Sequence, residues 1–185
     1  MNPFDMPIIS ARQVWHLSTY TPSGEWLPEH VDTYGKRMLQ GYESGLKRTI
    51  DSLPEHLRIM GNYFWSAQVE GSPDDRARYY AFTTYHLQVR ILETDKPKAW
   101  KARAMKLAMY AVNEVRHQNP PDMSGERRSL YQSQFLAEKA GVPITQFRRD
   151  AGEHWDWSIS LLDKWVGQAL GPVAKWIDVK KEAAA

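Results

Sequence analysis

Apolar residues recur at steps of three and four along most of this 185-residue chain, and this spacing constrains its fold more than any other feature. Such steps place apolar side chains on one face of an α-helix. One stretch runs from Glu29 to Leu53, and a second, rich in alanine, runs from Ala99 to Val115. No alternation of apolar and polar residues is bounded by hairpin turns, as antiparallel strands would require. The sequence predicts an all-α fold, although the aromatic residues between Tyr79 and Leu92 would suit either a helix or a strand.

Capping residues predict where several helices begin. Ser10 precedes a short predicted helix over residues 11–17, and Ser72 is the expected N-cap of the segment that follows it. Ser52 stands ahead of Pro54 and Glu55, a capping-box arrangement that predicts a helix running to about residue 65.

Prolines and glycines also divide the chain into parts. Four prolines predict an irregular arm over residues 1–28, followed by a helical bundle over residues 29–117. Residues 118–125 are the strongest break, and they leave residues 126–185 for a helix-turn-helix and C-terminal helices. The last helix should carry an apolar stripe that ends at Gly171 and Pro172. That stripe would pack on the bundle or, because it is rich in tryptophan, form a docking or dimer surface.

Composition excludes several classes of protein. With 42% apolar and 12% aromatic residues the chain can bury a sizeable core. It contains no cysteine, which excludes disulfides, thiolate zinc sites and cysteine nucleophiles. His117 and His154 have acidic neighbours but no metal-ligand motif, and no phosphate-binding loop or nucleophile elbow is present. We therefore expect no enzyme, cofactor or metal. We also expect no signal peptide, no membrane partner and a cytoplasmic location in a bacterial host cell.

The net charge of +2 hides an uneven distribution. Residues 1–75 carry a net charge of −4, residues 76–149 a net charge of +8 and residues 150–185 a net charge of −2. A basic middle is a plausible footprint for a polyanion such as DNA. A solvated helix surface would explain the same charges equally well.

One motif in the chain is specific. From Leu136 to Arg149 the sequence reads Leu-Ala-Glu-Lys-Ala-Gly-Val-Pro-Ile-Thr-Gln-Phe-Arg-Arg, the spacing of a helix-turn-helix. Ala137 is small where the two helices would touch, and Gly141 can take the positive φ that the turn needs. Pro143 cannot continue the first helix but suits the start of the second. The buried contacts are expected at Leu136, Ala140, Val142 and Phe147.

The second helix of this motif carries side chains suited to DNA. Thr145, Gln146, Arg148 and Arg149 should project outward, where Gln can pair with adenine, Arg with guanine and Thr with phosphate. Arg127, Arg128 and Lys139 are expected to contact the DNA backbone. Asp150 departs from the usual apolar residue and, with Glu153 and Asp156, makes the rest of that helix acidic. Alternatively, the motif is a helical hairpin that never contacts DNA.

The chain also resembles a known family. Residues 57–66 read Leu-Arg-Ile-Met-Gly-Asn-Tyr-Phe-Trp-Ser, and the helix-turn-helix ends in Phe147-Arg148-Arg149-Asp150 with Glu153-His154-Trp155 beyond it. This layout resembles phage-encoded late-gene antitermination proteins of the Q type. The resemblance implies a transcription regulator that binds a DNA element near a late promoter and makes bacterial RNA polymerase ignore terminators. Some such proteins carry a cysteine zinc module, which this chain lacks.

Three functions therefore stay open. The chain could be an antitermination factor, a small terminase-like subunit of a DNA-packaging ring, or a helical adaptor or inhibitor that binds protein only. The first two imply double-stranded DNA as a partner, and the second implies a homo-oligomer. In the first, exposed aromatic residues of the acidic N-terminal part, such as Trp15 or Trp26, would contact polymerase. The alternative is that these residues simply cover the bundle.

Overall fold

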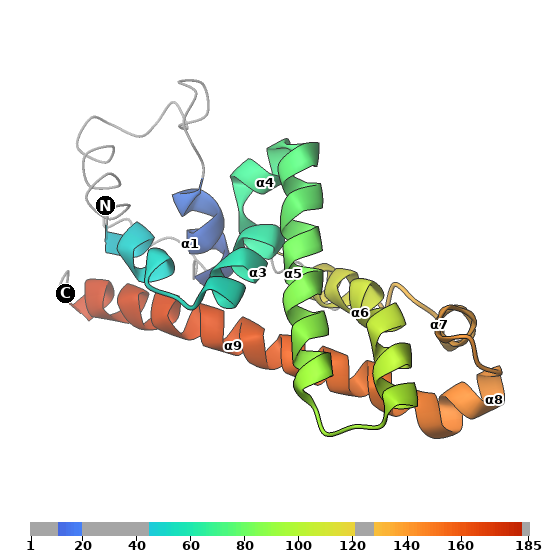
Figure 1. Cartoon of the computed structure of the whole chain (residues 1–185). Coiled ribbons are helices and arrows are strands. Elements are labelled where there is room, and N and C mark those ends of the chain that lie inside the picture. Colours follow the sequence, from blue (N-terminus) through green and yellow to red (C-terminus); the bar gives the residue numbers. More distant parts are fainter. Residues whose placement is uncertain (1–10, 20–44, 121–127, 183–185) are drawn as a thin grey trace.

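The structure is a computed structural model that describes residues 11–19, 45–120 and 128–182. Within these ranges all regular structure is helical, so the predicted all-α class is confirmed (Figure 1). A helix covers residues 45–51. The other elements are α1 (Ala11–Ser18), α3 (Glu55–Trp65), α4 (Ala67–Gly71), α5 (Pro73–Glu93), α6 (Lys98–Gln118), α7 (Ser133–Ala140), α8 (Ile144–Gln146), η1 (Phe147–Ala151) and α9 (Gly152–Glu182).

Helix α9 is the scaffold on which the other helices assemble. It runs along the length of the molecule, and its most extensive packing is against α6 (Figure 1). Helices α5 and α6 form an antiparallel hairpin, and α3 packs against both α5 and α9. Helices α7 and α8 lie at the opposite end of the molecule from α1 (Figure 1).

One predicted helix start is confirmed and one is wrong. The Asp75 amide donates to Ser72 Oγ at 3.2 Å, so Ser72 caps α5 as expected. Residues 11–18 form helix α1, and Ser10 lies outside the described residues. Ser52 is not an N-cap, because α3 begins after Pro54 without a side-chain cap. Its hydroxyl instead donates to the Thr49 carbonyl at 2.7 Å, the local competition for backbone partners that is typical of serine.

Residues 79–92, whose aromatic side chains would suit either a helix or a strand, belong to the long helix α5. Of the helix predicted over residues 29–53, only the last part is described, and residues 45–51 are helical. In the predicted irregular arm, residues 11–18 form α1, and Pro3, Pro7, Pro22, Trp26 and Pro28 lie outside the described residues.

The expected helix end at Gly171 and Pro172 is wrong, because α9 continues to Glu182 with Pro172 inside it. Proline within a helix lacks an amide donor and costs about 3 kcal/mol. Beyond the proline, Val173 and Ile177 are only 0% and 6% exposed. Burying two such side chains stabilises by about 1.5–3 kcal/mol each, which is sufficient to offset the proline. The apolar stripe packs on the bundle, as one of the two interpretations predicted.

Trp15 is a buried member of the main core. It is 0% exposed, so it cannot be the exposed aromatic anchor that the sequence suggested as one possibility. Its ring meets that of Trp65 edge-on at 5.3 Å, and its Nε1 donates to the Asn62 side chain at 3.2 Å. A Cβ on Gly61 would stand 2.3 Å from the Trp15 ring. Helix α1 can therefore lie against α3 only because residue 61 has no side chain.

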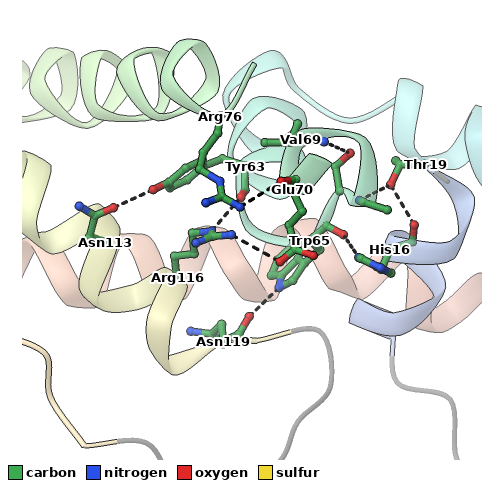
Figure 2. A network of polar contacts seen from close by, with 12 residues as sticks. His16, Thr19, Tyr63, Trp65, Val69, Glu70, Arg76, Asn113, Arg116 and Asn119 are labelled. Atoms are coloured by element: carbon green, nitrogen blue, oxygen red, sulfur yellow. Dashed lines mark hydrogen bonds and ion pairs between the residues drawn. The ribbon is translucent and has the colours of Figure 1, made fainter. Parts of the chain in front are cut away.

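A network of polar contacts closes this end of the core (Figure 2). Trp65 Nε1 donates to the Asn119 carbonyl at 2.9 Å, and the Trp65 carbonyl accepts from His16 Nδ1 at 3.0 Å. Arg116 Nε donates to the Tyr63 carbonyl at 3.1 Å, and the Tyr63 hydroxyl donates to Asn113 at 2.7 Å. These contacts join α1, α3 and α6, and they satisfy polar groups that burial would otherwise leave unpaired.

We expect Gly61→Ala to lower the free energy of unfolding by about 1–3 kcal/mol, because the added methyl overlaps the Trp15 ring. The measurement is chemical denaturation followed by tryptophan fluorescence. Gly167→Ala is the matched control, since a Cβ at this helical glycine meets nothing within 4 Å. The control should stabilise by up to about 1 kcal/mol. Equal stability of Gly61→Ala and the wild type would contradict this account of the core.

A histidine pair lies where α3, α5 and α9 meet. The ring of His56 lies 4.9 Å from that of Trp165 and 6.2 Å from that of His86. Burial lowers the pKa of His56, and the nearby charges of Arg90 and His86 lower it further. The folded state therefore favours neutral His56, whereas the unfolded chain protonates it at its ordinary pKa of about 6.5.

The sign of the pH dependence follows from this lowered pKa. Above about pH 6.5, His56 is neutral in both states and does not lower the free energy of unfolding. As the pH falls from there through the lower, folded-state pKa, the unfolded chain binds the proton first, so the free energy of unfolding decreases. Wild-type protein should therefore lose more stability between about pH 7 and pH 5 than His56→Gln, which cannot titrate. Chemical denaturation of both proteins at each pH checks this, because they differ only at residue 56. Parallel pH profiles would show that His56 does not contribute.

Candidate nucleic-acid interface

The turn between α7 and α8 has the backbone that the motif predicts. Gly141 adopts φ 75° and ψ 38°, a left-handed conformation that glycine takes without a Cβ clash. Its amide donates to the Glu138 carbonyl and the Val142 amide donates to the Ala137 carbonyl, both at 3.0 Å. This pair of bonds is the Schellman arrangement that ends helices at glycine. Pro143 then stands at the N-cap of the next helix, as expected.

The two helices of this hairpin share a small apolar cluster. Its buried members are Leu107, Leu136, Ala137, Ala140 and Phe147. The sequence predicted the last four as contacts between the two helices, and Val142 packs against the cluster while remaining half-buried. Leu107 comes from α6, so the hairpin is attached to the bundle through the same cluster that holds its two helices together.

The second helix starts as α8 and then passes through an unusual turn, η1. In η1 the Gly152 amide donates to the Phe147 carbonyl, five residues back instead of four. A regular helix turns about 100° per residue, which would place Trp155 about 80° away from Phe147. The wider turn absorbs one residue, and both side chains pack on the α7 cluster. Arg148 and Arg149 lie within this wide turn.

The structure places most of the predicted DNA-contacting residues on the surface of the hairpin. Thr145, Arg148 and Arg149 are exposed and Gln146 is half-buried. Lys139 is half-buried, with its ammonium over the Phe135 ring at 5.1 Å and near Glu138 at 3.6 Å. Arg128 is exposed in the segment before α7, and Arg127 lies outside the described residues.

Lys106 is a basic residue of this surface that sequence reasoning missed. It lies on α6, yet its Nζ is 3.3 Å from the position that a Cβ on Gly141 would occupy. Its charge therefore stands beside the turn, next to the start of the second helix. Only the tertiary packing of α7 on α6 could reveal this neighbour, because 35 positions of sequence separate the two residues.

The acidic side chains beyond the turn are partly compensated. Glu153 accepts a hydrogen bond from Lys96 Nζ at 2.6 Å. This hydrogen bond and the charge of Lys96 lower the pKa of Glu153. The contact joins the first turn of α9 to the loop before α6, whereas Asp156 remains exposed on the next turn.

A buried carboxylate holds the segment that leads into α7. Glu114 on α6 is 2% exposed. Its Oε2 accepts from the Leu130 amide at 3.0 Å, and its Oε1 accepts from Gln118 Nε2 at 2.6 Å. Hydrogen bonds to a charged group contribute about 1.5–3 kcal/mol. Glu114 therefore fixes the position of Leu130, shortly before α7.

Residues 11–19, 45–120 and 128–182 contain no group of three or more His, Asp or Glu side chains that could hold a metal ion. No helix among these residues has both the length and the apolar character needed to cross a bilayer. No family model, curated protein or solved structure matches the chain.

We expect Glu114→Ala to release the segment before α7 without unfolding the bundle. Removing the carboxylate leaves the Leu130 amide without its acceptor. Hydrogen–deuterium exchange at Leu130 should accelerate at least tenfold, while the amides of α5 keep their protection. Gln118→Ala, which removes only the second bond to Glu114, should leave Leu130 protected. Unchanged exchange at Leu130 in Glu114→Ala would contradict the proposed anchor.

Proposed function

We propose that this chain is a sequence-specific protein that binds double-stranded DNA through the hairpin of α7, α8 and η1. The observation that carries the proposal is the left-handed turn at Gly141, followed by a helix whose first turns expose Thr145, Arg148 and Arg149. A helix of this kind can enter the major groove with its first residues and read base edges there. Arg is suited to guanine, and half-buried Gln146 is the candidate for adenine.

The surroundings of the turn supply candidates for phosphate contacts. Lys106 stands beside Gly141, and Lys139 and Arg128 lie on α7 and the segment before it. The first backbone hydrogen bond of the second helix runs from the Phe147 amide to the Pro143 carbonyl at 2.9 Å. The amides ahead of Phe147 therefore have no partner within the helix and can face an anion.

The acidic residues of α9 limit how the DNA can lie. Glu153 and Asp156 follow the wide turn directly, and a phosphate backbone running along them would be repelled. Only the residues up to η1 can thus face the duplex, and the rest of the helix must leave the groove. The position of the hairpin at one end of the molecule allows this approach (Figure 1).

The more specific role that we propose is that of a transcription regulator of the antitermination type, acting on bacterial RNA polymerase. The support for this role is the resemblance of the sequence layout. The burial of Trp15 removes that side chain from any polymerase contact. A terminase-like packaging subunit and a protein-only adaptor are the alternatives, and the experiments below separate them.

DNA binding is tested with a duplex selected from a random pool, using fluorescence anisotropy. Arg148→Ala and Arg149→Ala should each weaken binding by about 1–3 kcal/mol if they contact bases, and each should relax the preference for one base pair. Lys106→Ala should weaken binding to all sequences alike and flatten the salt dependence, because it removes a phosphate contact. Lys175→Ala, an exposed lysine on the distal part of α9, is the matched control and should change nothing.

The outcomes distinguish the candidate functions. Failure of the wild-type protein to bind any duplex at low salt would overturn the DNA-binding proposal and leave the adaptor. Binding accompanied by read-through of a terminator on a template that carries the selected site supports antitermination. Binding by a stable multi-subunit ring favours the packaging subunit.

A further inference from the structure

Helix α5 is apolar on two opposite faces. Its inner face is buried in the core through Thr83, Leu87 and Ile91. The opposite face carries an outer stripe that consists of Phe82, Tyr85, Val89 and Leu92. Phe82, Tyr85 and Leu92 are 42%, 58% and 56% exposed. Single exposed apolar residues are common, but a contiguous row of them on one helix is typical of an interaction surface.

The centre of α5 also lacks charge. No Asp, Glu, Lys or Arg occurs between Tyr79 and Val89, although a quarter of the whole chain is charged. Arg78 and Arg90 stand on either side of this interval. Aromatic residues without charge at the centre, surrounded by charged residues, are the composition of a protein–protein interface.

The spacing of the outer stripe matches a helical partner. Steps of three, four and three are those of coiled-coil core positions, so another helix can pack along the stripe. In an antiparallel pair of identical helices, Phe82 of one copy faces Leu92 of the other, and Tyr85 faces Val89. Each aromatic ring then meets an aliphatic side chain. A parallel pair would instead place like residues opposite each other.

Charges at the ends of the stripe favour the same antiparallel pairing. Its register brings Glu93, the last residue of α5, level with Ala81 of the other copy, one turn from Arg78. Arg78 is exposed with its guanidinium 5.6 Å above the Phe82 ring. Glu93 is also exposed and already contacts Arg90 of its own helix at 2.7 Å, and it is the opposite charge nearest to Arg78 in this register. In a parallel pair, Arg78 would face its own copy and repel it.

We propose that the outer stripe of α5 is a homodimer surface, on which a second copy of this chain packs its own α5 antiparallel. Half-exposed aromatic side chains contribute about 100 Å² each. Four side chains of at most this size on each of two copies bury up to about 800 Å², which is below the range of stable specific interfaces and within that of weak, transient ones. The dimer is therefore weak and reversible. The surface lies on a different helix from the candidate DNA-binding hairpin, so the proposal does not depend on DNA binding.

The test is analytical ultracentrifugation of the full chain over a range of concentrations up to hundreds of micromolar. Wild-type protein should pass reversibly from monomer to dimer. Tyr85→Glu should weaken the dimer at least tenfold, because it buries a charge in the seam. Leu130→Glu, at an exposed apolar residue outside α5, is the control and should leave dimerisation unchanged. Circular dichroism verifies that each variant is folded.

A charge exchange shows whether the partner is a second copy. Arg78→Glu alone brings two acids together at each end of the dimer, and Glu93→Lys alone brings two bases together. Each variant should therefore dimerise more weakly than the wild type. An equimolar mixture should form the heterodimer, in which both ends again carry opposite charges. Any one of three results would overturn the proposal. The wild-type chain could stay monomeric, the dimer could be insensitive to Tyr85→Glu, or the mixture could dimerise no more tightly than the separate variants.

Discussion

The contact between Trp15 and Gly61 is the constraint on which the rest of the fold depends. The Trp15 ring lies where a Cβ of residue 61 would stand, so it can approach α3 this closely only because that residue is glycine. Trp15 then packs on Trp65, and Trp65 bonds to the end of α6 through the Asn119 carbonyl. One missing methyl group therefore determines how α1, α3 and α6 meet. A residue with low helix propensity is retained here because close approach outweighs propensity.

Helix α6 also fixes the position of the candidate DNA-binding hairpin. The hairpin is too small to bury a core of its own, and it takes Leu107 from α6 as the centre of its cluster. Glu114, two turns further along α6, holds the segment that enters α7. One helix thus contributes to the main core, the hairpin cluster and the anchor of the hairpin. A binding surface attached in this way is held in one orientation relative to the bundle.

Local signals in the sequence were sufficient to predict most of the helices and the turn at Gly141. The apolar steps of α6 and the glycine after α7 act over a few residues, and the structure follows both. Pro172 and Ser52 misled because tertiary burial and a competing carbonyl outweighed the local preference. Lys106, Glu114 and the wide turn of η1 depend on neighbours distant in sequence, which no periodicity reveals. The aromatic residues of α5 were expected to suit either a helix or a strand, and its outer stripe was not recognised, because periodicity alone does not tell which of two apolar faces is buried.

Part of the basic excess of residues 76–149 is used within the fold. Arg116 lies 3.6 Å from Glu70 and its guanidinium lies 5.1 Å above the Tyr63 ring, so its charge is used in holding α6 to α3 and α4.

Arg76, Arg90 and Lys96 likewise contact a carbonyl or a carboxylate of this chain. The group around the hairpin comprises Lys106, Arg128, Lys139, Arg148 and Arg149, and these residues come from three different segments of the chain. The charge pattern of the sequence alone therefore overstates the region available to a polyanion. The group around the hairpin lies at the end of the molecule that carries α7, α8 and the turn at Gly141 (Figure 1).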